Sequence, residues 1–260
     1  MQCKNCEYSL ETTNKFCANC GAKKIHNRLT IKSLWSDFFE RFLNYDNTLL
    51  KTARHMFTKP EVVIDSFIQG TRKKYLNPFN FFLVSLAITG LYNFLYKSFL
   101  LEETIAFYQN SFKSFGQDEL FSDNGFDGFT FFLEYFNLFA FASIPINAFV
   151  TKVTFWKNKK YNFTEHIVIN LYTVSQYQLI IYTISIPLLF LSLEAQTTIG
   201  MLFFLCFIFY FFYVFVRLYK LNGIQLFKKL VTVFFIAIGF FILLLIITIL
   251  GGFLYAAYNN

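Results

Sequence analysis

Four cysteines near the N-terminus have the spacing of a metal site. Cys3 and Cys6 form one Cys-x-x-Cys pair, and Cys17 and Cys20 form a second pair after ten intervening residues. Four thiolates in two such pairs can close a tetrahedral shell around Zn²⁺. A closed shell leaves no open position for a substrate, so the spacing predicts a structural rather than a catalytic zinc ion. Iron binding or a redox dithiol is the alternative use of the same residues.

A short folded segment must hold these cysteines together, and we place this zinc ribbon at residues 1–25. Gly21 follows the last cysteine and allows the backbone to turn its N–H groups toward sulfur. So small a segment lacks a core that folds without metal, so zinc should contribute to its stability. We expect the ribbon to contact a protein partner. Nucleic acid is not the expected partner, because the ribbon is only mildly basic and offers few aromatic rings for base stacking.

The composition of the whole chain is that of a membrane protein. Of the 260 residues, 55% are hydrophobic and 39 are Phe. The mean hydropathy is +0.44. A soluble domain of this length has too little interior to bury so much apolar surface, whereas lipid accommodates it. The sequence therefore predicts an all-α integral membrane protein.

Five apolar stretches are long enough to cross a hydrocarbon core of roughly 30 Å as helices. We place these transmembrane helices at residues 79–101, 129–150, 166–191, 197–216 and 230–254. Together they predict a transmembrane bundle that extends over residues 79–260.

Residues 26–78, between the ribbon and the bundle, are predicted to form amphipathic helices. Apolar residues at helical spacing over 31–43 give one apolar face, and residues 48–57 give a second amphipathic segment. A capping-box pattern at Thr58-Lys59-Pro60-Glu61 predicts the start of a third helix, and Gly70 is predicted to end it. These helices are expected on the cytoplasmic membrane surface or against the base of the bundle, and an ordinary soluble helical subdomain is the alternative.

The distribution of basic residues predicts the orientation in the membrane. Of the 23 Lys and Arg residues, 21 lie within 1–78, 151–165 and 217–229, whereas the segment between the first two spans is acidic. By the positive-inside rule, the N-terminus lies in the cytoplasm of a bacterium, the chain crosses the inner membrane, and the C-terminus is periplasmic. Free thiolates persist in the reducing cytoplasm, which agrees with this placement of the ribbon.

Several motifs resemble those of a known family. They are the paired cysteine motifs, Arg28-Leu29-Thr30, Lys51-Thr52, the segment around Pro60, the run Gly70-Thr71-Arg72-Lys73-Lys74-Tyr75-Leu76-Asn77-Pro78-Phe79, and Asn162-Phe163-Thr164-Glu165-His166. Over essentially the whole chain they resemble the bacterial membrane family catalogued as domain of unknown function 3667, which is common in Bacteroidetes. The resemblance implies a ribbon joined to a membrane bundle. It implies no activity and no catalytic residue.

Ionisable and polar residues within the predicted spans are candidate functional sites. Glu134 is one, and its alternative is a carboxylate that water reaches at the outer interface. Glu165 and His166 could form a proton-active pair or metal ligands, although such a pair more often caps a helix start. Five amides could line a polar path or form hydrogen bonds between helices. These amides are Asn137, Asn147, Asn170, Gln176 and Gln178.

A cationic run precedes the first span and is the candidate contact for anionic lipid. Arg72, Lys73 and Lys74 are consecutive and stand directly before the apolar residues that begin near Phe79. Such a cluster on the cytoplasmic side of a span attracts anionic headgroups.

Three functions fit these features. We expect first a non-catalytic adaptor or assembly factor that recruits a partner through the ribbon. The alternative is a small-molecule or ion transporter or channel, based on the polar residues of the second and third spans. The third is a membrane enzyme acting on lipid, but the chain has no phosphate-binding glycine loop, Gly-x-Ser-x-Gly or His-Glu-x-x-His. The sequence contains no internal duplication that would indicate an inverted-repeat transporter, and it indicates no oligomeric state.

Overall fold

The computed structural model describes residues 2–11, 15–22, 30–32, 48–114, 127–236 and 238–239, without the side chains of 110–114 and 127–128. The chain divides into two compact units, Met1–Tyr45 and Asp46–Asn260. Most of the amphipathic helix predicted at 31–43 and most of the fifth predicted span lie outside the described residues.

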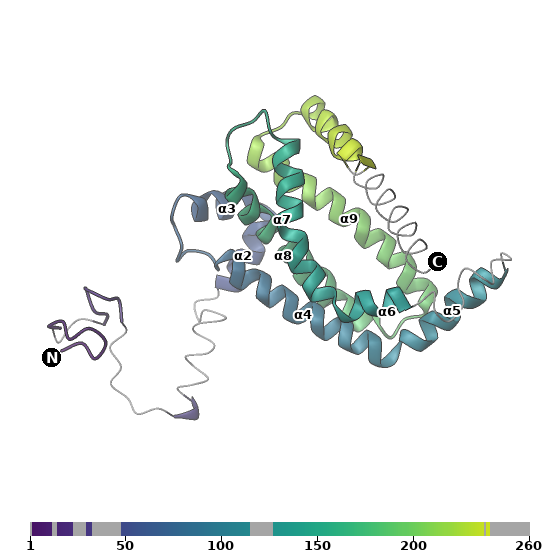
Figure 1. Ribbon diagram of the computed structural model, residues 1–260, viewed down its shortest axis with the longest axis horizontal. Coiled ribbons are helices and arrows are strands. Elements are labelled where there is room, and N and C mark those ends of the chain that lie inside the picture. Colours follow the sequence, from purple (N-terminus) through teal and green to yellow (C-terminus); the bar gives the residue numbers. More distant parts are fainter. Residues whose placement is uncertain are drawn as a thin grey trace, which may run out of the picture. The chain divides into compact units, whose positions relative to one another are not determined.

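The second unit is helical throughout its described part (Figure 1). Its helices are α2 (Thr48–Thr58), α3 (Pro60–Ile68), α4 (Pro78–Phe99), α5 (Leu101–Ser114), α6 (Asp127–Glu134), α7 (Phe136–Thr154), α8 (Phe163–Leu188) and α9 (Leu193–Tyr219). Residues 223–236 are also helical. The described residues contain no β-strand, only isolated bridges within the first unit. The predicted all-α fold class is therefore confirmed.

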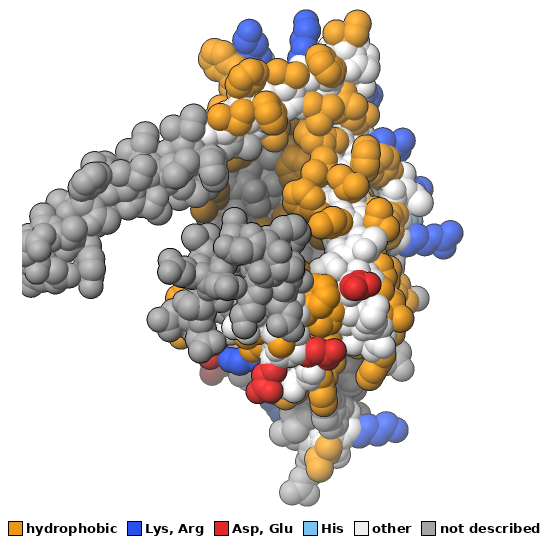
Figure 2. Space-filling view, turned by 90° about the vertical axis from the view of Figure 1, so that its right-hand side faces the viewer, with side chains coloured by type: hydrophobic (Ala, Val, Ile, Leu, Met, Phe, Trp, Pro, Cys, Tyr) orange, Lys and Arg blue, Asp and Glu red, His pale blue; other side chains and the backbone are white. Residues whose placement is uncertain are grey.

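Among the described residues, four helices, α4, α7, α8 and α9, are long and apolar enough to cross a membrane. Figure 2 shows how extensively hydrophobic side chains cover one face of the described surface. The chain thus has the structure of a multi-pass membrane protein. The first, third and fourth predicted spans correspond to α4, α8 and α9 with shifted ends, and α4 begins at Pro78. The described helical residues 223–236 reach only the start of the fifth predicted span.

The second predicted span, residues 129–150, is not one continuous helix. Tyr135 has φ −99° and ψ 14°, which departs from helical values, and it separates α6 from α7. At the other end α7 continues past the predicted boundary to Thr154. Its last turn carries the polar residues Thr151 and Thr154, which are buried, and their hydroxyl groups donate to the carbonyls of Ala148 and Val150. These internal bonds let polar residues continue an otherwise apolar helix.

Helix α8 lies at the centre of the bundle and packs against α4, α7, α9, α2 and α3. Half of its most apolar stretch is buried, compared with 11% of that of α9. The buried residues of α8 include many polar ones, namely His166, Asn170, Thr173, Ser175, Gln176 and Gln178. Because such groups are costly to expose to hydrocarbon, α8 is the helix that the others surround.

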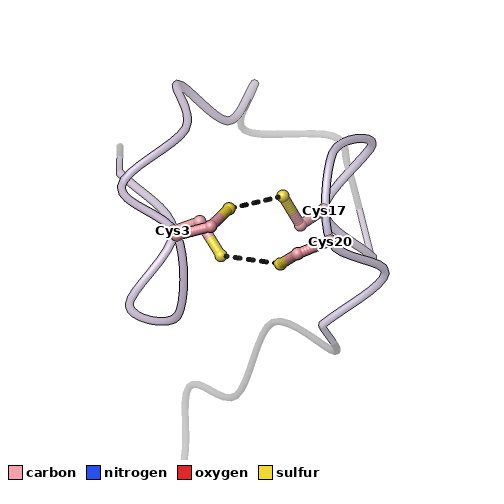
Figure 3. A group of neighbouring side chains, drawn as sticks. Cys3, Cys17 and Cys20 are labelled. Carbon is pink, nitrogen blue, oxygen red and sulfur yellow. Dashed lines mark hydrogen bonds between the residues drawn. The ribbon is translucent and has the colours of Figure 1, made fainter.

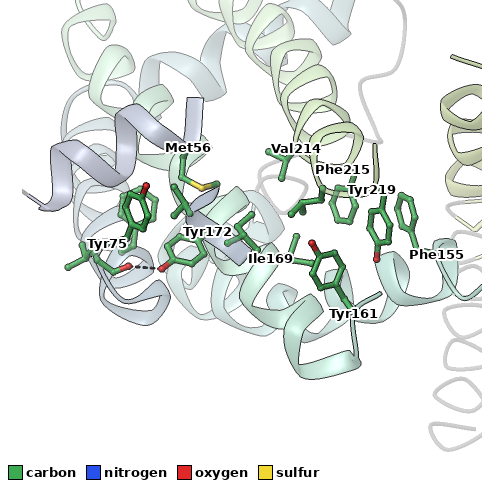
Figure 4. Close-up of a cluster of buried hydrophobic side chains, with 14 residues drawn as sticks. Met56, Tyr75, Phe155, Tyr161, Ile169, Tyr172, Val214, Phe215 and Tyr219 are labelled. Carbon is green, nitrogen blue, oxygen red and sulfur yellow. Dashed lines mark hydrogen bonds between the residues drawn. The ribbon is translucent and has the colours of Figure 1, made fainter. Parts of the chain in front are cut away.

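Helices α2 and α3 pack against the bundle rather than forming a separate subdomain. Met56 of α2 and Ile64 of α3 are fully buried in one apolar cluster with Tyr172 of α8 and Phe215 of α9 (Figure 4). Burying a side chain of this size contributes about 1.5–3 kcal/mol, so this cluster is a substantial part of the attachment. Of the placements expected for these helices, packing against the bundle is the one observed.

The carbonyl groups at the end of α2 bind side chains of α9. Helix α2 ends at Thr58, because Pro60 supplies no N–H to continue it. Its terminal carbonyls would otherwise lack partners. The Tyr210 hydroxyl donates to the carbonyl of Met56 at 3.2 Å, and the Tyr213 hydroxyl donates to that of Phe57 at 2.8 Å. The end of α2 is thereby hydrogen-bonded to a transmembrane helix.

The predicted capping box at the start of α3 is wrong, whereas the predicted stop at Gly70 is correct. Lys59 is the N-cap, and Thr58 still belongs to α2, where its hydroxyl donates to the Arg54 carbonyl. Glu61 instead accepts two hydrogen bonds from Arg217 of α9, at 2.6 and 3.0 Å. Gly70 has φ +94° and ends α3 in the left-handed conformation that glycine adopts readily.

Candidate metal centre and polar sites of the bundle

The four cysteines of the first unit lie together as a metal site requires (Figure 3). Their sulfur atoms are all within 4.8 Å of one another. Cys3 and Cys20 are 3.6 Å apart at sulfur, and so are Cys6 and Cys17. A tetrahedron with metal–sulfur bonds of about 2.3 Å has edges of about 3.8 Å, whereas a disulfide bond is about 2.05 Å long. The four thiols are therefore free and arranged to bind a metal ion.

Each Cys-x-x-Cys pair forms the same backbone turn. In the first, the Glu7 N–H donates to the Cys3 carbonyl at 2.8 Å; in the second, the Gly21 N–H donates to the Cys17 carbonyl at 2.9 Å. Glu7 and Gly21 occupy equivalent places and both have positive φ, 59° and 70°. The turn expected at Gly21 is thus confirmed. The equivalent turn at Glu7 was not predicted, because a left-handed glutamate leaves no signal in the sequence.

Two asparagines reach across the site to the sulfur atoms of the opposite pair. The Asn19 side chain donates to Cys6 sulfur at 3.8 Å. The Asn5 side chain donates to Cys20, and this bond, together with the backbone N–H of Ala22, lowers the pKa of Cys20 to about 6. Donors of this kind favour the thiolate that binds metal. An Asn precedes the second Cys of each motif, and this repeat is the feature of the sequence from which the two asparagine contacts could have been predicted.

The ribbon has little core apart from the cysteines. Cys3, Leu10 and Cys17 are its buried hydrophobic residues, with Cys6 and Ala22 packed against them. Two aromatic side chains remain on its surface, since Tyr8 is 51% exposed and Phe16 is 58% exposed. A bound ion would therefore supply most of the attraction that holds the described part of the ribbon together.

We predict that Asn5→Ala weakens metal binding by about tenfold, because side chains that hydrogen-bond to metal ligands typically contribute about 10–100-fold to affinity. Competition of the purified full-length protein with a chromophoric chelator measures the change. Gln2→Ala, which truncates an exposed side chain beside Cys3, is the control and should retain wild-type affinity. Equal affinity of all three proteins would show that the asparagine bond has no effect on the metal.

Glu165 and His166 are neighbours in sequence but have separate roles in the structure. Asn162 and Glu165 form a capping box at the start of α8, with side-chain to backbone bonds of 2.7 and 2.9 Å. Glu165 therefore caps the start of α8, which is the alternative role predicted for this residue from the sequence. His166 is fully buried; its Nδ1 lies 2.9 Å from the Thr151 hydroxyl and its Nε2 lies 3.2 Å from the Tyr219 hydroxyl. Both ring nitrogens thus have partners, on α7 and α9.

We predict that His166→Ala lowers the free energy of unfolding by about 2–4 kcal/mol, because it leaves a cavity and removes the partner of two buried hydroxyl groups. Glu165→Gln is the matched comparison and should change stability by less than about 0.5 kcal/mol, since glutamine also completes a capping box. Denaturant titration in detergent micelles measures both. Equal large losses would indicate that the two residues function as a pair.

Glu134 and Asn137 lie together where α6 and α7 meet α4. Glu134 is 3.6 Å from the ammonium group of Lys97, and the two side chains are 57% and 48% exposed. With Gly90 and Asn137 they line a cavity of about 230 Å³. An added Cβ at Gly90 would lie 3.1 Å from the Asn137 amide, so glycine permits the close approach of α4 and α7. Both interpretations of Glu134, as a functional carboxylate and as one that water reaches at the outer interface, stay predictions.

The other polar residues of α8 bind neighbouring helices. Asn170 donates to Thr151 at 3.0 Å, Gln176 to the Ala53 carbonyl at 3.0 Å, and Gln178 accepts from Ser85 at 3.0 Å. For these three amides, the interpretation as interhelical hydrogen bonds is confirmed.

The cationic run between α3 and α4 is exposed. Arg72, Lys73 and Lys74 all face outward. Arg72 lies 5.8 Å from the ring of Phe67, and Lys74 lies 5.5 Å from the ring of Tyr75. Their contact with anionic lipid stays a prediction.

Comparison with known proteins gives one match. Residues 46–90 match the family model described as Protein of unknown function (DUF3667), the family that the sequence motifs resemble, and the match is to this segment. The matched segment covers α2, α3 and the first part of α4. No curated protein and no solved structure matched the chain.

Proposed function

We propose that this chain, which carries the DUF3667 segment at residues 46–90, is a non-catalytic membrane adaptor or assembly factor. Its N-terminal ribbon would recruit a protein partner to the membrane bundle. The observation that carries the proposal is a four-cysteine metal site beside two exposed aromatic residues, Tyr8 and Phe16. Such a site organises a surface without providing a reactive position.

Zinc is the ion we assign to the site, in a structural role. Four thiolates in a tetrahedral arrangement suit Zn²⁺, which has no redox chemistry and no geometric preference from d-electrons. The Asn5 donor further favours the thiolate form of Cys20. The few buried apolar residues of the ribbon support a folding role for the ion.

The exposed aromatic residues support a protein partner. Tyr8 and Phe16 are on a small unit that offers few other large apolar side chains among its described residues. Tyrosine and other aromatic residues are enriched where interfaces derive most of their binding energy. A ribbon folded around zinc would present them at low entropic cost, because the metal fixes the backbone beside them.

The bundle fits the role of an anchor better than that of a transport path. The buried amides and histidine of α8 are hydrogen-bonded to residues of α2, α4, α7 and α9. Their donor groups are already used in packing, and the side-chain oxygens of Asn170 and Gln176 are buried among the helices rather than facing an open path. The observation that favours the transport alternative is the cavity beside Glu134 and Asn137.

The experiment compares partner recruitment by four full-length proteins, cross-linked in cells, purified in mild detergent and analysed by quantitative mass spectrometry. Wild type is expected to hold about one zinc ion per chain. Cys17→Ser/Cys20→Ser should lose both the zinc and the enriched partners. Tyr8→Ala/Phe16→Ala should keep the zinc and lose the partners by about tenfold. Cys206→Ser removes an exposed thiol of α9 and is the control.

Retention of the same partners by both ribbon variants would contradict recruitment through the ribbon. In that case Glu134→Gln becomes the informative variant, since a transport function predicts impaired flux with a normally folded protein. Loss of partners from Cys206→Ser as well would indicate a general effect on the protein rather than on the ribbon.

We also propose the bacterial inner membrane as the location, with the N-terminus in the cytoplasm and the C-terminus in the periplasm. Basic side chains of the predicted cytoplasmic segments 151–165 and 217–229 lie at one end of the bundle and support this orientation. Lys160 donates to the Leu218 carbonyl of α9 at 2.8 Å and lies 3.5 Å from Asp65 of α3. Lys229 donates to the Thr154 carbonyl of α7. Loops with such positive charge remain on the cytoplasmic side.

Reporter fusions test this topology. Alkaline phosphatase fused after Asn260 should be active, because five crossings place that end in the periplasm. The same enzyme fused after Lys220, which follows four crossings, should be inactive, whereas a fluorescent protein at Lys220 should be bright. Equal phosphatase activity at both positions would contradict the fifth span.

A further inference from the structure

An apolar groove lies between α7, α9 and the helical segment 223–236. Its volume is about 330 Å³, within the range of small-molecule sites. The three elements contribute mainly large apolar side chains, including Val150, Phe207, Phe211, Phe215, Leu230 and Phe234. Because α9 and α7 are candidate membrane spans, the groove lies at the depth of hydrocarbon.

A basic pocket lies at the end of the same groove. It has a volume of about 570 Å³ and is lined by three lysines, Lys157, Lys159 and Lys229, together with the amides of Asn158 and Gln225. None of the described residues that line it is acidic. The pocket therefore offers positive charge and amide donors to an anion.

Phe155 connects the groove to the pocket, since it lines both. Its ring stacks on Tyr219 at 4.2 Å and on Phe215 at 5.1 Å, as Figure 4 shows. Tyr219, near the end of α9, lines the pocket, whereas Phe215, Phe211 and Phe207, earlier in α9, line the groove. At a rise of 1.5 Å per residue, Phe207 lies about 18 Å from Tyr219 along the helix axis. Charge at the end of the helix and apolar surface below it match the two parts of a phospholipid.

Lys229 is held in place in the pocket without an acidic partner in the pocket lining. The Lys229 ammonium group donates to the Thr154 carbonyl and lies 4.9 Å from the ring centroid of Phe155. Burial, and then the charge of Lys157, lower the pKa of Lys229. Lys160, on the same loop as Lys157, does have an acidic partner, because its ammonium group lies 3.5 Å from the Asp65 carboxylate. An anion in the pocket would relieve the repulsion between Lys157 and Lys229.

We propose that this site binds one anionic phospholipid, with its phosphate between Lys157, Lys159 and Lys229 and an acyl chain in the groove. The site differs from the exposed run Arg72-Lys73-Lys74, which has no groove assigned to it. It is also independent of the zinc ribbon, so the failure of either proposal leaves the other unaffected.

Native mass spectrometry of the detergent-purified full-length protein, titrated with phosphatidylglycerol, tests the proposal. Wild type should bind it at least about tenfold more tightly than phosphatidylcholine with the same chains, since the headgroup charge is the difference. Lys157→Gln/Lys229→Gln should weaken binding by about 30-fold, the loss expected for two headgroup charges. Lys51→Gln/Lys59→Gln removes the same charge from α2 and the N-cap of α3, and should change affinity by less than about twofold.

A second pair of variants tests the groove without altering a lysine. Ile208→Trp would fill the groove and should weaken phosphatidylglycerol binding about tenfold, whereas Leu202→Trp, on the exposed surface of α9, should not. Glycerol phosphate, the headgroup without chains, should compete only weakly. The proposal would be overturned by any of three results. These are an equal loss of phosphatidylglycerol affinity in both double-lysine variants, equal affinity for the two lipids, or competition by glycerol phosphate as strong as that by the lipid.

Discussion

The polar side chains of α8 must be kept out of lipid, and the rest of the bundle is arranged to satisfy this constraint. The histidine and the amides bind neighbouring helices, whereas Thr173 and Ser175 donate to carbonyls of α8 itself. His166 contacts α7 and α9, Gln176 contacts α2, and Gln178 contacts α4. Since an unpaired polar group in hydrocarbon is costly, these bonds specify which helices surround α8 as well as adding stability. The apolar contacts alone, dominated by phenylalanine, would accept many packings.

The same constraint explains why the DUF3667 segment includes α2 and α3 as well as the first part of the transmembrane helix α4. Helix α4 begins beside the middle of α8, where the Tyr172 hydroxyl donates to the Leu76 carbonyl at 2.7 Å. Helices α2 and α3 pack against the same part of α8, where Gln176 donates to the Ala53 carbonyl of α2 and Met56 and Ile64 are buried in one cluster with Ile169 and Tyr172. The matched residues 46–90 thus include both the helices that cover α8 and the start of the first span.

The sequence predicted the features that depend on local patterns. Apolar runs located four spans, cysteine spacing located the metal site, and Gly70 located the end of α3. Features that depend on distant residues were not predictable. Thr58 and Glu61 have the spacing of a capping box, but Arg217 binds Glu61 from 156 residues away. Similarly, nothing near His166 in sequence identifies Tyr219 as its partner.

The bonds that hold the end of α2 have a consequence for biosynthesis. The hydroxyl groups of Tyr210 and Tyr213 that bind the Met56 and Phe57 carbonyls lie 154 and 156 residues later in the chain. At roughly 5–20 residues per second, α2 leaves the ribosome roughly 8–30 s before its partners are translated. During that interval the apolar face of α2 and α3 that packs against α9 is uncovered. Until α9 is inserted, this face must therefore be protected by a chaperone, the insertion machinery or the bilayer surface.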